Sequence, residues 1–497
     1  MNVEQLFSKI PFAEIISKPN VNITGVSINS NTVESGDLFI PLIGQKSNGY
    51  RFINQALQKG ATAVAGDEIR SRKNHLACIY LPNAEKHLPF ICSTVYENPS
   101  KKIQTIGITG TSGKTITAHL IEALIRETQK TKVGVIGSTG YRWGSSNQEA
   151  NLTTPLCTDL QRMLKKMVDS GVGSVVIECS SHGIEQKRLD YTHFDTCIFT
   201  NLSQDHLDYH GSFVSYRNSK WELFSKLLCE SQKNRKHAIF NIDDPTGRSW
   251  ARESLPFIET ITYSVEKNSK ASIYLEKFQQ NSMGMDLKIR IYDHELHIRT
   301  PMLGLFNVQN IMASLATALV LGLDLDKCAE IISRGVYVPG RLEKLVGTAN
   351  FNVFIDYAHS EEALSQLLSV MNQIKKNRVI TVFGCGGDRD KVKRPNMGRI
   401  AVEKSDIVIV TSDNPRNEDP EKILDEIFMG IDQKQFSNKE IFRITKRADA
   451  IEHALRMARK GDIVLIAGKG HETYQQIGDF KHPFEDRKIV KAWMMNR

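Results

Sequence analysis

The chain has 497 residues, of which 40% are hydrophobic and 24% are charged, and its 64 Lys and Arg exceed its 56 Asp and Glu to give a net charge of +8. This composition excludes a disordered or fibrous protein, and no apolar run reaches the ~18 residues that a membrane-spanning helix needs. At ~100–200 residues per domain, the length predicts roughly three domains. The positive excess is modest and its basic clusters are short, which favours solvated faces or an anionic small substrate over nucleic-acid binding.

The N-terminus and the cysteines both point to a cytoplasmic protein. Residues 1–5 contain neither a basic leader nor an apolar core, so they do not resemble a signal peptide. The eight cysteines include no CxxC pair, and most lie in apolar runs. We therefore expect reduced, buried thiols rather than a disulfide or zinc framework.

Two turn-forming breaks divide the sequence into three segments. Residues 98–102 are polar and precede a strong strand, and Val338-Pro339-Gly340 precedes a second strand-rich stretch. The expected domains are therefore residues 1–99, 100–338 and 339–497. The first segment has the least regular pattern.

The other two segments alternate strands and helices. The middle segment predicts strands at 103–109, 133–136, 174–178 and 194–200, and a helix after residue 113 whose apolar face comprises Ile116, Leu120, Ile121, Leu124 and Ile125. The last segment predicts strands at 351–355, 379–383, 407–411 and 463–467, and helices near 361–374, 420–431 and 447–459. This rhythm predicts an α/β fold with mostly parallel sheets. Ligands of such sheets lie beyond the carboxyl ends of the strands.

The strongest local motif is Thr109-Gly110-Thr111-Ser112-Gly113-Lys114-Thr115, between a predicted strand and a predicted helix. Backbone amides of such a loop, with the helix N-terminus, bind phosphate groups. Lys114 would neutralise β- and γ-phosphate charge, and the Thr115 hydroxyl would ligate Mg²⁺. The strict spacing is not met, because it would require Gly at Ile108, but the strand–loop–helix context favours nucleotide binding over an ordinary glycine turn.

Two further strand ends in the middle segment carry acidic and histidine side chains. Glu178 ends the strand at 174–178, where it could contact a metal ion or simply cap a turn. Residues 205–210 hold two Asp and two His, including His206, directly after the next strand. Metal or phosphate contact competes here with an internal hydrogen-bond network, and Mg²⁺ is favoured over zinc because no thiolate is near in sequence.

Four polar turns follow strands in the last segment. They are residues 356–359, 384–391, 413–416 and 468–472. One such turn is unremarkable, but four in one domain predict an edge that faces a ligand. A fifth polar stretch, residues 304–310, precedes an Ala-rich helix and could be either a ligand contact or a helix cap.

Taken together, these motifs resemble the Mur ligase family of ATP-dependent amide-bond-forming enzymes. The resemblance covers nearly the whole chain and keeps the motif order GTSGKT, ECSSHG, DHLDYHG, GRLE, DYAH and DNPR. It implies three α/β domains: a small N-terminal UDP-binding domain, a central P-loop ATPase-like domain and a C-terminal Rossmann-like domain.

The resemblance also assigns site residues. The positions matched to ATP are Gly110, Thr111, Ser112, Gly113, Lys114, Thr115, Asn310, Arg341, Asp356 and His359. The positions matched to Mg²⁺ are Thr115, Glu178, His206 and Lys220, and those matched to catalysis are Lys114, Lys220 and His206. The positions matched to the UDP-sugar peptide are Ser30, Thr153, Thr154, Ser180, Gln186 and Arg188. The positions matched to the amino acid are Arg389, Asp413, Asn414, Pro415, Arg416, Gly468 and Glu472.

Lys220 matches the lysine that this family carbamylates. A bare ammonium would repel Mg²⁺, whereas reaction with CO₂ converts it to an anion that can hold the metal. Composition alone would predict that Lys220 is a surface residue of a helix. Only the resemblance predicts that it lies in the site as a carbamylated lysine.

The N-terminal segment departs from the common family pattern. Asn29-Ser30-Asn31 stands where many members have Asp-Ser-Arg, and Gln45-Lys46-Ser47 stands where His-Gln-Ala is familiar. Residues 36–39 retain the family motif Gly-Asp-Leu-Phe. The UDP contacts of this segment are accordingly the least defined.

The Asp-Asn-Pro-Arg motif at 413–416 implies that the added amino acid is meso-2,6-diaminopimelate. This molecule has a second carboxylate that lysine lacks, and a guanidinium such as that of Arg416 can bind it bidentately. Lysine would leave the arginine unpaired in a closed site. The implied activity is ATP-dependent addition of diaminopimelate to UDP-N-acetylmuramoyl-L-alanyl-D-glutamate through an acyl phosphate, in cytoplasmic synthesis of peptidoglycan precursors and hence in cell-wall growth, cell shape and division.

The alternatives fall into two classes. The first contains ligases of the same architecture: lysine-adding relatives, the D-Ala-D-Ala-adding enzyme and folylpolyglutamate synthetase. The second is a P-loop motor or nucleic-acid-binding ATPase, although no Walker-B strand and no aromatic–basic interleaving is apparent. We expect a monomer that binds small molecules and neither nucleic acid nor membrane.

Overall fold

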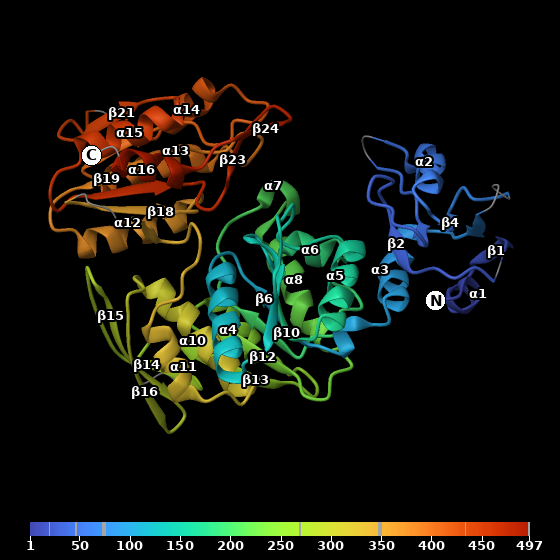
Figure 1. The fold of residues 1–497 in the computed structure, drawn as a ribbon. Coiled ribbons are helices and arrows are strands. Elements are labelled where there is room, and N and C mark those ends of the chain that lie inside the picture. Colours follow the sequence, from blue (N-terminus) through green and yellow to red (C-terminus); the bar gives the residue numbers. More distant parts are fainter. Residues whose placement is uncertain are drawn as a thin grey trace.

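The computed structural model describes residues 1–18, 20–44, 47–71, 76–267, 270–345, 350–432 and 434–495. The chain folds into three α/β domains, and the N-terminal domain (blue) and the C-terminal domain (orange and red) flank the middle one (Figure 1). Gln45 and Lys46, part of the segment that departs from the family pattern, lie outside the described residues. No helix of the described part is long and apolar enough to cross a membrane.

The first domain is built on a five-stranded sheet in the order β1-β5-β4-β3-β2. Its strands are β1 (Glu14–Ser17), β2 (Gly25–Ser27), β3 (Asp37–Phe39), β4 (Ala63–Gly66) and β5 (Ala77–Tyr80). Its helices are α1 (Val3–Phe7), α2 (Ile53–Gln58) and α3 (Ala84–Val95). Only β1 runs antiparallel to its neighbour. The strands are short, which explains the weak sequence pattern of this segment.

The middle domain holds an eleven-stranded sheet in the order β16-β15-β14-β13-β12-β11-β6-β10-β7-β8-β9. Its strands are β6 (Gln104–Thr109), β7 (Lys132–Gly137), β8 (Gly140–Trp143), β9 (Ser146–Gln148), β10 (Val172–Glu178), β11 (Thr196–Phe199), β12 (His237–Asn241), β13 (Glu259–Ser264), β14 (Ile273–Asn281), β15 (Gly284–Ile291) and β16 (His294–Thr300). The run from β14 to β7 is parallel, as predicted, and antiparallel strands extend it at both ends. The sequence analysis missed these extensions. In β15 buried and half-buried residues alternate, so only one face is apolar.

Helices cover this sheet and supply its core. They are α4 (Lys114–Gln129), α5 (Cys157–Asp169), α6 (Ser181–Glu185), α7 (Leu207–His210), α8 (Phe213–Glu222) with a π-helical continuation (Leu223–Leu228), α9 (Pro245–Trp250), α10 (Leu305–Val320) and α11 (Leu325–Ser333). The predicted apolar face of α4 is buried throughout, and α4 packs against α10. The cysteines are also buried as expected, with Cys229 only partly so.

The C-terminal domain has a six-stranded sheet in the order β17-β18-β22-β19-β20-β21, with a separate hairpin. Its strands are β17 (Glu343–Leu345), β18 (Asn352–Asp356), β19 (Val379–Phe383), β20 (Ile407–Val410), β21 (Glu440–Arg443), β22 (Ile463–Ala467), β23 (Tyr474–Ile477) and β24 (Phe480–Pro483). Its helices are α12 (Glu361–Ile374), α13 (Lys393–Lys404), α14 (Pro420–Phe428), α15 (Arg447–Met457) and α16 (Asp486–Met495). The four predicted strands and three predicted helices are confirmed to within a few residues.

An arginine joins the first domain to the second. Arg162 of α5 donates to Tyr96 Oη at 2.9 Å, to Val26 O at 3.1 Å and to Asp37 Oδ2 at 3.1 Å. Asp37 belongs to the retained Gly-Asp-Leu-Phe motif, and its side chain is only 3% exposed. The motif therefore helps to orient the first domain on the second.

Candidate active site

A cavity of about 600 Å³ lies between the middle and C-terminal domains. Residues that follow seven strands line it: Ser138 after β7, Ser180 after β10, His206 after β11, Tyr357 after β18, Gly384 after β19, Asp413 after β20 and Gly468 after β22. The carboxyl ends of both sheets therefore face one space, where α/β proteins bind ligands. The predicted site residues in its wall are Thr153, Ser180, Arg188, His206, His359, Arg389, Asp413, Asn414, Arg416, Gly468 and Glu472.

The phosphate-binding motif forms the turn between β6 and α4. Gly110 has φ +149°, and a Cβ there would lie 1.9 Å from Thr200 Oγ1. Gly113 has φ +87°, and a Cβ there would lie 2.4 Å from Asn310 Oδ1. Only glycine fits at either position, and Asn310 therefore packs directly against the loop, as its predicted role requires.

Two lysines of the motif region share one acceptor. Lys114 Nζ donates to Gly110 O at 2.7 Å and to Thr111 O at 3.0 Å, while Lys220 Nζ donates to the same Gly110 O at 2.9 Å. Burial lowers the pKa of both lysines, and their mutual repulsion lowers that of Lys220 further. Two cations beside one carbonyl oxygen form a site for an anion.

Lys220 is a residue of α8, but it does not lie on the surface as composition alone would have it. Its side chain is buried, with 2% of the residue exposed. The ammonium also lies 4.6 Å from the centre of the Tyr216 ring. Its lowered pKa increases the fraction of neutral amine, which is the form that reacts with CO₂.

An oxygen cluster lies beside the phosphate loop. Thr115 Oγ1 donates to Glu178 Oε2 at 3.1 Å, and Ser138 N donates to Glu178 Oε1 at 3.1 Å. Arg341 Nη2, from the C-terminal domain, donates to Thr115 Oγ1 at 3.3 Å. Hydroxyl and carboxylate oxygens are the ligands that Mg²⁺ prefers, so Thr115 and Glu178 fit the ion that the family implies.

His206 is held beside Asp205 at the start of α7. Its Nε2 lies 3.5 Å from Asp205 Oδ2, and its φ is +54°. Burial lowers the pKa of His206 to about 4, so the ring is neutral near pH 7 and can accept a proton or bind a metal. The ring of His182 lies 4.9 Å away.

The residues matched to the UDP-sugar peptide fall into two places. Thr154 Oγ1 lies 2.9 Å from Ser180 Oγ, and Arg188 Nη1 donates to Thr154 O at 2.7 Å. Arg188 Nε also donates to Gln186 Oε1 at 3.1 Å. Ser30 instead lies in the first domain, where its hydroxyl donates to Gln55 Oε1 at 2.8 Å.

The remaining nucleotide candidates come from the C-terminal domain and do not all face the cavity. His359 lines it, whereas Asp356 accepts hydrogen bonds from Leu342 N at 2.5 Å and Ala358 N at 2.7 Å. Burial raises the pKa of Asp356. Asp356 therefore fixes the chain just after Arg341, while the Arg341 guanidinium stacks 4.5 Å from the Tyr357 ring.

Arg389 and Arg416 both line the opposite wall. Arg416 Nη1 donates to Gly387 O at 2.6 Å, and burial together with nearby Arg389 lowers the pKa of Arg416. Arg389 has a long bond to Asp388 O at 3.3 Å. Two adjacent guanidiniums thus favour a ligand with two carboxylates.

Acidic groups beside these arginines are held in place by a lysine that the sequence analysis did not select. Lys469 Nζ donates to Asn414 Oδ1 at 3.0 Å and to Glu472 Oε2 at 2.8 Å, and Asn414 Nδ2 donates to the same Glu472 oxygen at 2.8 Å. Lys469 is fully buried. Glu472 and Asp413 therefore present carboxylates to the cavity, a setting suited to an ammonium group.

Some cavity residues were given no individual role by the sequence. Asp205, Tyr357 and His471 lie in stretches predicted to face a ligand, whereas His182 and Lys393 were not selected. His471 Nε2 lies 3.0 Å from Ser138 O and so links the two domains. Each of the five lies within or beside a motif quoted from the sequence, but its place in the cavity wall depends on tertiary packing.

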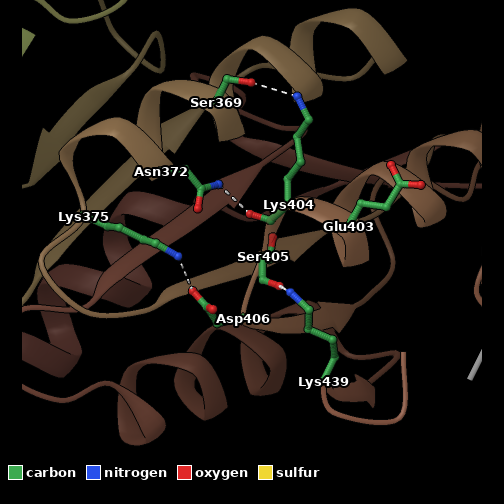
Figure 2. Close-up of a pocket in the computed structure, with 8 residues that line it drawn as sticks. All are labelled: Ser369, Asn372, Lys375, Glu403, Lys404, Ser405, Asp406 and Lys439. Carbon is green, nitrogen blue, oxygen red and sulfur yellow. Dashed lines mark hydrogen bonds and ion pairs between the residues drawn. The ribbon is translucent and has the colours of Figure 1, made fainter. Parts of the chain in front are cut away.

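A second hollow of about 500 Å³ lies on the C-terminal domain (Figure 2). Lys375 pairs with Asp406 at 3.0 Å, Lys404 bonds to Ser369 Oγ at 2.8 Å and Lys439 bonds to Ser405 O at 2.6 Å. All three lysines that line it thus have partners, and none of the predicted site residues lies in its wall.

Residues 22–107 match the family described as Mur ligase family, catalytic domain, residues 108–318 the Mur ligase middle domain, and residues 340–470 the Mur ligase glutamate ligase domain. The chain is 37% identical to the UDP-N-acetylmuramoyl-L-alanyl-D-glutamate–2,6-diaminopimelate ligase of Geobacillus thermodenitrificans, with 100% of each chain covered. It is 38% identical to the protein of the same name from Geobacter metallireducens, covering 99% of this chain and 98% of that one.

Solved structures agree with these matches. A structure of a UDP-N-acetylmuramoyl-L-alanyl-D-glutamate–2,6-diaminopimelate ligase has a TM-score of 0.69 and 32% identity, covering 100% of this chain and 99% of that one. The MurF ligase from Thermotoga maritima in complex with ADP has a TM-score of 0.67 at 18% identity, covering 95% and 97%, and shows the same fold. By full-length identity and by the match of all three domains, the chain belongs to the Mur ligase family.

Proposed function

We propose that this protein is an ATP-dependent ligase that adds meso-2,6-diaminopimelate to UDP-N-acetylmuramoyl-L-alanyl-D-glutamate, in the synthesis of peptidoglycan precursors in the cytoplasm. One observation carries the proposal. A single cavity has Ser138, which bonds to Thr115 and Glu178 beside the phosphate loop, in its middle-domain wall, and Arg389, Arg416, Asp413 and Glu472 in the opposite wall. The first wall suits ATP and the second suits an amino acid with two carboxylates and two ammonium groups.

The first step transfers a phosphoryl group. A carboxylate oxygen of the terminal D-glutamyl residue attacks the γ-phosphorus of ATP, the bond to the β-phosphate oxygen breaks, and ADP and an acyl phosphate result. Lys114 and the free amides at the N-terminus of α4 stabilise the charge that develops on the phosphoryl oxygens. Arg341 reaches this side from the C-terminal domain, so domain closure would complete the site.

Thr115 and Glu178 would supply oxygen ligands for Mg²⁺, and His206 and Lys220 would hold a second ion. Bound Mg²⁺ would neutralise phosphate charge. Lys220 suits this role only as a carbamate: its neutral amine attacks CO₂, a C–N bond forms, and a proton leaves to solvent. Protein incubated with ¹³C-bicarbonate should acquire a carbamate signal that Lys220→Ala lacks, and an unlabelled wild-type protein would refute this modification.

The second step forms the amide bond. The diaminopimelate amine attacks the acyl carbon, the tetrahedral intermediate expels inorganic phosphate, and the amine loses a proton. Arg389 and Arg416 hold the two carboxylates, while Glu472 and Asp413 hold the ammonium group that does not react. His206, which lines the cavity on the middle-domain side, is a candidate acceptor for the released proton.

The three domains divide these tasks. We assign UDP binding to residues 1–99, ATP binding to residues 100–338 and amino-acid binding to residues 339–497. The N-terminal contacts would include Ser30, and the middle-domain contacts to the UDP-sugar peptide would include Thr153, Thr154, Ser180, Gln186 and Arg188. All reactants are then small molecules, and a monomer suffices because the cavity is formed by one chain.

The decisive experiment measures ADP release with the UDP-dipeptide and each of meso-diaminopimelate, L-lysine and L-ornithine. We expect turnover with diaminopimelate and little with the other two, because each leaves one arginine without a carboxylate. Equal rates with lysine would overturn the proposed substrate. ATP hydrolysis that needs nucleic acid instead of the two substrates would overturn the reaction class.

A further inference from the structure

A buried arginine that takes no part in the proposed chemistry lies behind the amino-acid wall. Arg394, near the N-terminus of α13, has a fully buried side chain. Its Nη1 donates to Glu418 Oε2 at 2.9 Å and to Glu426 Oε2 at 2.6 Å, and its Nη2 donates to Glu418 Oε1 at 2.9 Å and to Gly386 O at 3.0 Å. The pair with Glu418 has the bidentate geometry that a guanidinium and a carboxylate favour.

Stability alone does not account for this arrangement. Burying an ion pair loses several kcal/mol of hydration per ion, and apolar side chains of the same volume are often as stable. A cation in the first turn of a helix is also unfavourable, because the helix dipole is positive there. A buried arginine in this place is better explained by what it holds in position.

Arg394 and Glu418 join two loops. Gly386 lies in the loop after β19, and Glu418 lies in the loop between β20 and α14. Glu418 Oε1 also accepts a hydrogen bond from Asp388 N at 2.6 Å. One guanidinium and one carboxylate thus bind both loops at once, and these loops carry Arg389 and Arg416.

The two loops meet again at the cavity. Gly387 N donates to Asn414 O at 2.9 Å, and Arg416 Nη1 donates to Gly387 O at 2.6 Å. Arg416 has φ +51°, a left-handed conformation that is strained for a side chain of this size. Its backbone is fixed by bonds to the β23–β24 hairpin, from Arg416 N to Gln476 O at 3.1 Å and from Gly478 N to Arg416 O at 2.7 Å. Such a conformation persists only where its surroundings hold it from several sides.

On the cavity side of the two loops, the guanidiniums of Arg389 and Arg416 repel each other. Arg389 and Arg416 are like charges in one partly buried space, so without a ligand they tend to separate the loops. The bonds of Arg394 and Glu418 behind the loops resist this separation. They would keep the two guanidiniums at the distance that two carboxylates of one molecule can span.

We propose that Arg394, acting through Glu418, is a positioning residue that fixes the spacing of Arg389 and Arg416 and thereby makes the site selective for an amino acid with two carboxylates. This inference rests on the proposed function. Arg394 touches neither substrate nor reacting atoms, and it acts only through the two loops.

The test compares Arg394→Met with a matched structural variant, Arg378→Met. Arg378 pairs with buried Asp462 at 2.7 Å in the same domain, but at the amino ends of β19 and β22 and so at the opposite edge of the sheet. Both variants should unfold at a lower temperature. Only Arg394→Met should raise KM for diaminopimelate, by roughly 10- to 100-fold as expected for a displaced binding group, with KM for ATP and for the UDP-dipeptide unchanged. It should also reduce the preference for diaminopimelate over lysine.

A second comparison covers the case in which Arg394→Met does not fold. Glu418→Gln and Glu426→Gln each remove one carboxylate from the same guanidinium, but Glu426 lies on α14, outside both loops. Glu418→Gln should raise KM for diaminopimelate and Glu426→Gln should not. Arg394→Lys keeps the positive charge but not the planar guanidinium that binds Glu418 bidentately. Compared with Arg394→Met, it should restore the unfolding temperature more than it restores KM for diaminopimelate.

The results separate this inference from the function on which it rests. Equal KM changes in Arg394→Met and Arg378→Met, or in Glu418→Gln and Glu426→Gln, would show that Arg394 has only a structural role. Wild-type protein that uses lysine as well as diaminopimelate would instead refute the proposed substrate.

Discussion

The two walls of the cavity handle charge in different ways. At the phosphate loop, behind Ser138 of the middle-domain wall, the charged groups bond to neutral partners: Lys114 and Lys220 to the Gly110 carbonyl, and Glu178 to Thr115 and Ser138. On the C-terminal wall the acids are paired with buried cations, such as Glu472 with Lys469. The first wall leaves its cations to be neutralised by phosphates, whereas the second is balanced around two arginines and suits a zwitterion.

Lys114→Met should have the largest effect and test the first wall alone. It removes the ammonium that faces the transferring phosphoryl group, and we expect a loss of about 10³-fold or more in kcat, measured by phosphate release. The unfolding temperature should stay constant or rise, because a repulsion with Lys220 disappears. Lys130→Met, an exposed change at the end of the same helix, is the control. Full activity in Lys114→Met would refute the role of this wall.

Arg416→Met tests the second wall. A buried charge pair with the substrate is lost, so kcat/KM for diaminopimelate should fall by roughly 10²–10³-fold. KM for ATP should not change, and the rate with lysine should stay constant or rise. If KM for ATP rose in parallel, the two walls would not be independent.

The two walls also differ in how far the sequence could predict them. The phosphate loop is contiguous, so its glycines, Lys114 and Thr115 were identified from one motif and its context. Lys220 was identified only by family resemblance, because its burial depends on packing between α8 and the loop that no local pattern encodes. Eight parallel strands (β6, β7, β10, β11, β18, β19, β20 and β22) were predicted because they are continuous apolar runs, but the parallel strands β12, β13 and β21 were not. The antiparallel strands β14–β16 were not, since only one of their faces is buried.

The C-terminal wall is assembled from four loops that are far apart in sequence. Arg389 and Arg416 were selected from their motifs, but their support by Arg394, Glu418 and the β23–β24 hairpin depends on contacts between loops. Lys469 lay inside a recognised motif, and only its buried bonds to Asn414 and Glu472 reveal what it does. Sequence therefore selected the proposed binding groups more readily than the groups that hold them in position.

Arg162→Met should have a smaller effect that leaves both walls intact. It removes the bonds that hold the first domain to the second and leaves Asp37 buried without its partner. We expect KM for the UDP-dipeptide to rise about tenfold, as for the loss of a partly buried ion pair, with kcat and the KM values for ATP and diaminopimelate unchanged. Glu34→Gln, which alters an exposed carboxylate 3.4 Å from the same guanidinium, should change little. An unchanged KM in Arg162→Met would mean that other contacts suffice to orient the first domain.

The smallest effect concerns acid stability and reports on the second wall only. The bond to Arg394 lowers the pKa of Glu418 from 4.5 to about 2. A carboxylate whose pKa is lower in the folded state stabilises the fold fully above its unfolded pKa, and this stabilisation is lost as the pH falls through the folded value. The contribution of Glu418 should therefore decline between about pH 4.5 and about pH 2.

Urea unfolding across this range should show a shallower loss of stability in Glu418→Gln than in wild type, because the variant has no carboxylate to protonate. Lys114→Met should keep the wild-type slope in the same range, since the phosphate wall contains no part of this ion pair. Equal slopes in wild type and Glu418→Gln would show that Arg394 does not stabilise the ionised form of Glu418. The Arg394–Glu418 ion pair would then not account for the link between the loops that carry Arg389 and Arg416.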